Sequence, residues 1–243
     1  TSNAVTNVAA LIEQPANQAA QSSSLAQDVV IKIAAVVARQ VAQYKNMPAT
    51  KQIELAALAA GAAAAKTSKE LGFSPAEQAT NAASFAAQIV NNGGFSLENQ
   101  VQLAVQAALV SGRANLLSSE ELQKIAEDVA QQTARDAGRD VESQAESAGA
   151  AAAAFAKSLG KSKEEQQKLA AAAAKRGAAE AGLDASKQEE YAANAAGQAA
   201  AESAAEEGKS LDEQVAMAMN VAKQYAADAG LSTALQIKIE AKA

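Results

Sequence analysis

A short phrase recurs along the chain, and it constrains the fold more than any other feature of the sequence. The phrase is Gly, any residue, Ser or Asp, and then Gln four residues later, as in GFSPAEQ from Gly72 and GKSKEEQ from Gly160. Copies are spaced by 22 residues, or by 26 in a few cases, and the extra four residues are close to one helical turn. Self-similarity at a fixed period indicates a repeat array. If the Ser or Asp is the first position, the repeats start at Ser22, Pro48, Ser74, Ser96, Ser118, Asp140, Ser162, Asp184, Ser210 and Ser232.

A stripe of small residues led by glutamine runs along each repeat. Positions 5, 9, 13 and 17 are four residues apart, so they lie on one side of a helix. Small residues there allow helix axes to approach closely, and larger apolar residues lie beside them at positions 8, 12 and 16. We predict that this stripe packs helix against helix. Its members are Gln52, Gln78, Gln100, Gln144, Gln166, Gln188, Gln214, Ala34, Ala60, Ala86, Ala108, Ala130, Ala152, Ala174, Ala196 and Ala222.

The glutamines have two interpretations, which the sequence leaves open. In the first, Gln is only a helix-compatible polar residue in the first turn. In the second, the Gln side chains hydrogen-bond neighbouring turns and set the register of the packed helices.

Each repeat ends and begins with residues typical of helix termini. Gly suits the left-handed residue that follows a helix, and Ser or Asp suits the N-cap. Glu three residues after several of the Ser residues completes a capping box, and Pro75 takes the first helical position. These signals argue against the alternative of one continuous helix with an 11-residue period. The predicted turn and cap residues are Gly72, Ser74, Gly94, Ser96, Ser118, Gly138, Asp140, Gly160, Ser162, Gly182, Asp184, Gly208, Ser210, Gly230 and Ser232.

We therefore predict an all-α fold: a bundle or α-solenoid-like array of about ten antiparallel helices with repeats of 22 or 26 residues. Tight turns of about two to three residues join them. The composition agrees, because Ala abounds and bulky apolar residues are scarce, which favours helix over sheet and excludes all-β and α/β folds. One repeat domain spans residues 22–243, after an arm of residues 1–21 that has a short helix near residues 4–14.

The sequence lacks the residues that most catalytic and metal sites use. It has no Cys and no His, which excludes disulfides, thiolate nucleophiles, imidazole bases and Cys/His zinc sites. Tyr44, Tyr191 and Tyr225 are expected to pack on the apolar face. We predict that the protein is not an enzyme and has no cofactor or metal. The acidic pairs, expected in first or last turns where first-turn carboxylates favour the helix dipole and are solvated, are Glu120 and Glu121, Glu164 and Glu165, Glu189 and Glu190, and Glu206 and Glu207.

The charge balance argues against nucleic acid as a partner. The net charge is −6, and residues 118–243 carry more acidic than basic side chains, whereas a DNA-reading helix-turn-helix needs a basic field. No apolar run reaches the length of a membrane span. The first residues lack the charged region of a signal peptide, and the compartment stays open, with secretion or an organelle lumen favoured over the cytoplasm.

The junctions Gly72-Phe73-Ser74 and Gly182-Leu183-Asp184, set between Ala-rich helices, resemble in style the helical repetitive units of spider wrapping and egg-case silk proteins. Those units carry more Ser and fewer charged residues than the 20% found here. Exchangeable apolipoproteins also repeat every 22 residues, but with Pro breaks and Leu-rich faces, so we expect weak lipid affinity here. Helical antifreeze proteins are similarly Ala-rich but carry a regular Thr ladder, which this chain lacks.

These observations predict a structural protein that works by assembly, as a building block or linker of a filament, matrix, extruded material or larger complex. Its partners are then itself or other subunits. The alternative is a helical binding module that shelters a lipid, pigment or other apolar ligand. That alternative draws on the larger side chains at helix-facing positions, which are Phe85, Phe155, Tyr191, Met217 and Tyr225.

Overall fold

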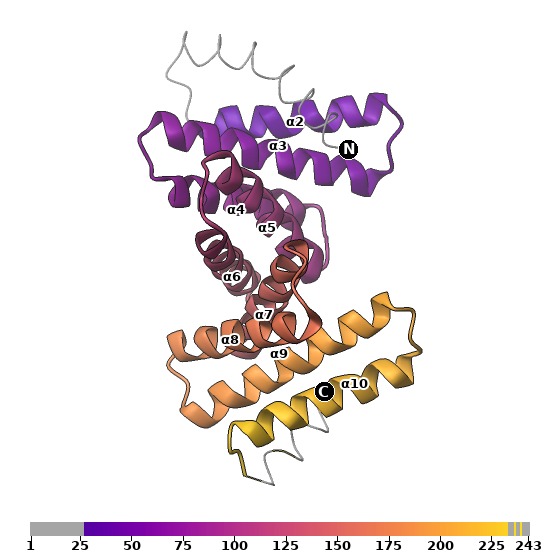
Figure 1. Cartoon of the computed structure of the whole chain (residues 1–243). Helices are drawn as coiled ribbons and strands as arrows, with labels where there is room; N and C mark the ends of the chain where they lie inside the picture. Colours follow the sequence, from indigo (N-terminus) through magenta and orange to yellow (C-terminus); the bar gives the residue numbers. More distant parts are fainter. Residues whose placement is uncertain (1–26, 233–235, 237–238, 240–243) are drawn as a thin grey trace. The chain divides into compact units, whose positions relative to one another are not determined.

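The computed structural model describes residues 27–232, 236 and 239, and within them the regular structure is entirely helical (Figure 1). The all-α array is therefore confirmed. The described residues contain nine helices against about ten predicted, because the repeat that starts at Ser232 lies mostly outside them. The helix expected near residues 4–14 and the repeat start at Ser22 also lie outside them. The helices are α2 (Gln27–Tyr44), α3 (Ala49–Glu70), α4 (Pro75–Asn92), α5 (Leu97–Ala114), α6 (Ser119–Asp136), α7 (Val141–Ser158), α8 (Lys163–Glu180), α9 (Ala185–Glu206) and α10 (Leu211–Asp228).

Helix length follows repeat length. The 22-residue helices α3 and α9 begin directly after Pro48 and Asp184, the starts of two 26-residue repeats, whereas helices such as α4 and α8 have 18 residues. The insertion therefore adds about one turn and leaves the packing face unchanged. The connections are longer than the predicted two to three residues. Each consists of four residues, because the C-cap, the left-handed residue, one further residue and the N-cap all lie outside the helices.

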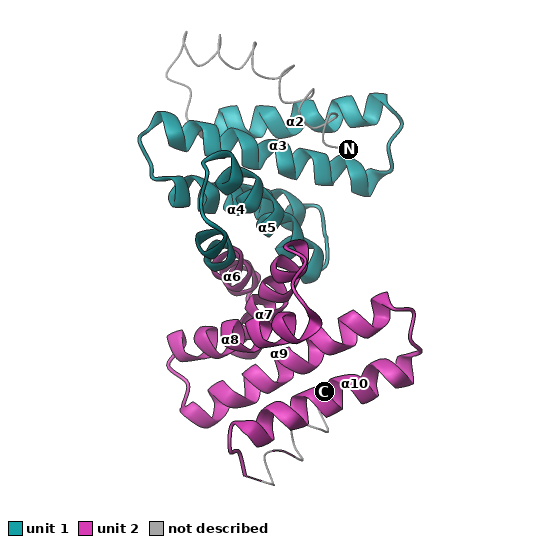
Figure 2. Ribbon diagram, in the orientation of Figure 1, with its two compact units in different colours: residues 1–125 teal, residues 126–243 magenta. Residues whose placement is uncertain are grey.

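The chain forms two compact units, residues 1–125 and residues 126–243, whose boundary falls within α6 (Figure 2). In unit 1, consecutive helices from α2 to α5 pack on one another, and α3 also contacts α5. In unit 2, consecutive helices from α7 to α10 pack in the same way, and α7 also contacts α9. Each unit thus repeats one arrangement, in which a helix contacts its neighbours in sequence and one helix beyond. The single repeat domain over residues 22–243 stays a prediction.

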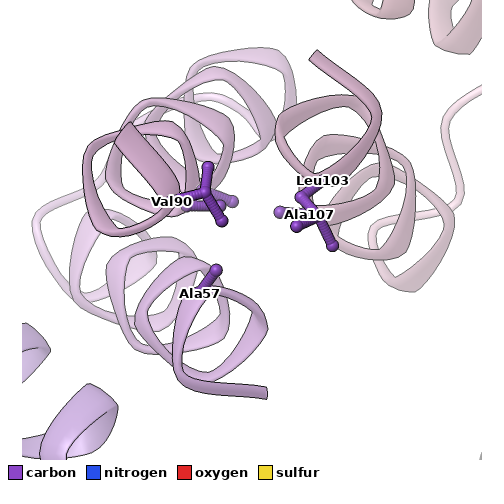
Figure 3. Packing of buried hydrophobic residues seen from close by; sticks show 6 residues of the cluster. Ala57, Val90, Leu103 and Ala107 are labelled. Carbon is purple, nitrogen blue, oxygen red and sulfur yellow. The ribbon is translucent and has the colours of Figure 1, made fainter. Parts of the chain in front are cut away.

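The core of unit 1 mixes alanine with larger aliphatic residues. Ala57 of α3, Val90 of α4, and Leu103 and Ala107 of α5 point into a common interior (Figure 3). The partly buried Ile53 packs at the edge of this cluster. Three helices therefore share one small core, as expected when each buries a single apolar face.

The core of unit 2 is built almost wholly from alanine. Phe155 of α7 is its largest fully buried side chain, at 2% exposed. Ile239, which follows α10 in the chain, is buried with Ala193, Ala222 and Ala226. Because alanine removes little apolar area per residue, this packing depends on closely spaced backbones. The main alanine cluster consists of Ala145, Ala153, Ala170, Ala174, Ala195 and Ala199.

Candidate functional site

The turns share one backbone geometry, and the turn at Gly160 shows it. Gly160 has a φ of 72°, and its N–H donates to the Lys157 carbonyl over 2.8 Å. The N–H of Lys161 donates to the Ala156 carbonyl over 3.1 Å, which completes a Schellman-type helix end. A left-handed φ strains most residues but not glycine, so the helix ends and the chain reverses direction at each of these glycines. The predicted turn glycines all have φ between 71° and 80°: Gly72, Gly94, Gly138, Gly160, Gly182, Gly208 and Gly230.

The Ser or Asp of each described turn caps the next helix. The Ser74 hydroxyl accepts a hydrogen bond from the Glu77 N–H, and the Glu77 carboxylate accepts bonds from the Ser74 hydroxyl and N–H. These bonds, the hydroxyl first, hold the pKa of Glu77 below its ordinary value. Ser232 lies at the end of the described residues, where its carbonyl accepts from the N–H of Gln236. The side chains that accept from the third helical N–H are those of Ser74, Ser96, Ser118, Asp140, Ser162, Asp184 and Ser210.

Where position 5 is a glutamine, its side chain closes the turn that precedes it. In the first such case, Gln52 Nε2 donates to the Met47 carbonyl, five residues earlier, over 2.8 Å. This carbonyl precedes the N-cap, outside any helix, and the glutamine provides its hydrogen-bond partner. The bond is therefore local to one turn, rather than a bond to a neighbouring turn as the second interpretation held. The same bond, at 2.7 or 2.8 Å, is made by Gln78, Gln100, Gln144, Gln166, Gln188, Gln214 and Gln236.

Two of these glutamines also bond to the end of another helix. Asn115, the C-cap of α5, donates to Gln78 Oε1 on α4 over 3.1 Å. Arg135 of α6 donates to Gln144 Oε1 on α7 over 3.3 Å. At these two places one side chain joins its own turn to a second helix, as the register interpretation expected.

Two of the described turns have a left-handed residue that is not glycine, and the repeat phrase does not mark it. Asn46 has φ of 54° and Leu116 has φ of 59°. Asparagine tolerates this conformation, whereas for leucine it is strained. The repeat that follows Leu116 also has Leu122 in place of the glutamine, and Leu122 packs beside Gly112. The sequence signal was the absence of glycine from the expected position of both repeats. Because a turn still has to form there, another residue must take the left-handed conformation.

The stripe alanines are buried between the helices. Each is at most 2% exposed. In unit 1, Ala34 on α2 packs with Ala38 against Ala59 and Ala63 of α3. In unit 2, Ala196 of α9 is buried with Ala171 of α8. The buried stripe is made of Ala34, Ala60, Ala86, Ala108, Ala130, Ala152, Ala174, Ala196 and Ala222.

Three helix-interior glycines mark the closest approaches to the backbone of a neighbouring helix among the described residues, and the predicted set did not include them. A Cβ on Gly61 of α3 would lie 2.8 Å from the Ala82 carbonyl oxygen of α4, and one on Gly197 of α9 would lie 2.8 Å from that of Ala218. Gly149 of α7 faces a carbonyl of α8 in the same way, at 3.0 Å. The signal was present, because glycine inside a helix costs about 1 kcal/mol relative to alanine and so indicates a packing reason.

Several acidic and aromatic residues lie in surroundings other than those expected. Glu190, expected among the first- and last-turn acids, is only 6% exposed. Tyr44, expected to pack, is 90% exposed. Tyr191 packs on the alanine cluster of α7, α8 and α9. Burial is the main cause that raises the pKa of its hydroxyl, and the negative charge of Glu190 raises this pKa further. Tyr225 packs beside Ala222 and Ala226. The rings of unit 2 therefore fill space between helices.

Among the described residues of unit 2, three ion pairs join different helices, and a fourth joins α8 to Glu207, the residue that follows α9. One of them joins the Arg176 guanidinium of α8 to the buried carboxylate of Glu127 on α6. Glu189, Glu206 and Glu207, from the acidic pairs of the sequence, are thereby partners of lysines rather than of one another. The pairs are Lys157 with Glu206, Lys163 with Glu207, Lys175 with Glu189, and Arg176 with Glu127.

Within the described ranges, no group of three or more His, Cys, Asp or Glu side chains is arranged to hold a metal ion. None of the helices in those ranges is both long enough and apolar enough to cross a bilayer. Comparison of the sequence with models of known protein families and with curated proteins finds no match.

Proposed function

We propose that this chain is a non-enzymatic structural protein, a helical building block or linker that works by assembling with itself or with other subunits. The observation that carries the proposal is the repetition of one module. The same capped turn, the same glutamine bond and the same buried alanine recur along both units. In repeat arrays each module contacts only its near neighbours, so such chains act through extended surfaces rather than through one enclosed site.

Exposed aliphatic side chains offer contact points on this array. Leu211 and Val215 lie four residues apart on α10, and Val110 lies on α5. Their removal from water on association would contribute about 25 cal/mol for each Å² buried. They stand outside the alanine clusters, so they can be changed without opening the core.

Light scattering and electron microscopy across a concentration series test the proposal. We expect particles larger than the monomer to appear as the concentration rises from micromolar to millimolar. The double variant Leu211→Lys/Val215→Lys should raise the concentration required by about tenfold, equal to about 1.4 kcal/mol. Asp212→Asn on the same helix is the matched control and should leave it unchanged. The proposal would be contradicted if the chain stays monomeric from micromolar to millimolar concentration and binds no other subunit.

A further inference from the structure

Two turns of unit 1 carry large apolar side chains that face water. Leu71 and Phe73 lie in the turn between α3 and α4, and they are 54% and 42% exposed. Leu116 lies in the turn between α5 and α6 and is 91% exposed. Large apolar side chains that gather at one place on a surface indicate a contact site, whereas single ones are ordinary.

Hydrogen bonds bring these two turns together at one end of the helices. Gln78 Nε2 donates to the Phe73 carbonyl in the first turn over 2.7 Å. The Oε1 atom of the same glutamine accepts from Asn115 Nδ2 in the second turn over 3.1 Å, and Asn115 directly precedes Leu116. One side chain thus holds both turns, so Leu71, Phe73 and Leu116 form one surface, which we call the turn patch.

Leu116 is strained within its own chain. Its φ is 59°, in the left-handed region where the glycines of the other turns have φ between 71° and 80°. A Cβ makes this conformation unfavourable, and the exposed side chain gains little packing in return. Backbone strain of this kind is typical of positions that serve a contact or a function. The strained leucine is explained if a partner buries its side chain.

We propose that the turn patch is the surface through which two copies of this chain pair, the patch of one copy packing on the same patch of the other. This inference rests on the proposed assembly role and names the contact with which self-assembly begins. A two-fold contact of this kind uses each residue twice and closes as a dimer.

The area of the turn patch suits a reversible dimer. Its three side chains present roughly 400 Å² of apolar surface, if a whole side chain of this size has about 200 Å². Two such patches remove roughly 800 Å² from water, and the polar rim around them brings the total near the about 1,200 Å² at which specific interfaces begin. We therefore expect an association that depends on concentration rather than an obligate dimer.

The charges around the turn patch favour a second copy over other partners. Lys69 and Glu70 lie just before the first turn, and both are exposed. Arg113 and Glu120, also exposed, lie before and after the second turn. A rim with both signs is self-complementary, since a two-fold axis can place each cation beside an acid of the other copy. A lipid or nucleic-acid surface instead requires a basic field, which this rim lacks.

Sedimentation velocity of the full chain over a concentration series tests the inference. Leu116→Gly should raise the dimer dissociation constant by about a hundredfold, because a two-fold contact loses two leucines that each contribute about tenfold. Its melting temperature should not fall, since the substitution relieves the strained φ. Tyr44→Ser is the matched control, because it removes a side chain that is 90% exposed beyond the other end of α3. It should leave the dissociation constant unchanged.

A cysteine cross-link gives a readout that depends on position, because the chain has no cysteine of its own. A short bismaleimide should link chains with Leu116→Cys into dimers at least about ten times faster than chains with Tyr44→Cys. If larger particles form but neither Leu116 variant differs from its Tyr44 control, the turn patch is not the contact, and the assembly role then depends on another surface. A wild-type chain that stays monomeric up to millimolar concentration would overturn both the turn-patch dimer and self-assembly.

Discussion

The two compact units use the same turns but different cores. Unit 1 buries several aliphatic side chains among its alanines, whereas unit 2 relies on alanine and on few larger residues. Alanine provides less apolar area, so each contact in unit 2 contributes less through transfer from water. The larger buried side chains are Ile31, Val90, Val101, Leu103, Leu122 and Ile125 in unit 1, and Val129, Phe155 and Ile239 in unit 2.

Unit 2, which buries few large aliphatic side chains, has ion pairs between its helices. Lysines and an arginine of α7 and α8 pair with glutamates of other helices, whereas in unit 1 the pair of Lys51 with Glu54 lies within α3. Partly exposed ion pairs contribute about 0–1 kcal/mol each, so they supplement the packing and cannot replace it. A single repeat geometry therefore accepts two kinds of core, provided that the helices approach closely enough.

The largest effect should come from Phe155, the largest fully buried side chain among the described residues of unit 2. Phe155→Ala should lower the free energy of unfolding by about 3–5 kcal/mol, because it leaves a cavity that neighbouring alanines cannot fill. Leu103→Ala, the matching change in unit 1, should cost about 2–3 kcal/mol, since larger neighbours can partly repack. Denaturant titration measures the totals, and hydrogen exchange assigns each loss to its unit. A cost of Phe155→Ala below that of Leu103→Ala would reverse the comparison.

The close helix contacts should respond alike in both units. Gly61→Ala in unit 1 and Gly197→Ala in unit 2 each place a Cβ 2.8 Å from a backbone oxygen. The overpacking cost of about 1–3 kcal/mol should exceed the gain of about 1 kcal/mol in helix propensity, so both proteins should melt earlier. Gly177→Ala is the control, because the nearest atom is the flexible Gln131 amide at 3.4 Å, and it should melt at the same temperature or later.

Replacing a turn glycine should lower the stability equally in unit 1, whose core contains several aliphatic side chains, and in unit 2, whose core is mostly alanine. Gly160→Ala, Gly182→Ala and Gly208→Ala should each lower stability by about 1 kcal/mol, because alanine is strained at positive φ. Gly94→Ala in unit 1 should cost the same, since its φ is 73°. Thermal melting by circular dichroism measures the shifts. In a continuous helical rod the same changes would raise the melting temperature, so a rise would contradict the turn geometry.

Relieving the strained leucine should stabilise the protein. Leu116→Gly removes the side chain from a left-handed position, and because Leu116 is 91% exposed little packing is lost. The expected gain is about 0.5–1 kcal/mol, the left-handed penalty less the extra chain entropy of glycine. Leu159→Gly, at φ of −92°, has no strain to relieve and should destabilise. Denaturant midpoints for the two variants must therefore move in opposite directions.

Salt should produce the smallest effect and should act on one unit. Raising ionic strength from about 0.01 M to about 1 M shortens the screening length from about 30 Å to about 3 Å. Unit 2 should lose up to about 1 kcal/mol because its ion pairs between helices are partly exposed, and exchange in unit 1 should stay nearly constant. Lys163→Gln should remove part of the dependence in unit 2. Equal salt dependence in both units would show that these pairs do not distinguish them.

Local signals predicted the helices and their ends because the responsible interactions act within a few residues. The residue type alone predicts the conformation at Gly138, because glycine tolerates a left-handed φ. It also predicts the helix start at Ser162, because the serine side chain caps the helix. The glutamine bonds were only half predicted, since the five-residue reach back to a carbonyl such as Phe73 O appears only once the turn is built.

The all-α repeat, its period and most of its turns follow from the amino-acid sequence, because capping, propensity and periodicity act over a few residues. Tertiary structure alone decided which glycine meets a backbone, as Gly61 does, and which acid is buried, as Glu127 is. It also decided how the core is divided between two units. These outcomes depend on which helix lies opposite a given face, and that choice is made by packing between residues far apart in the chain.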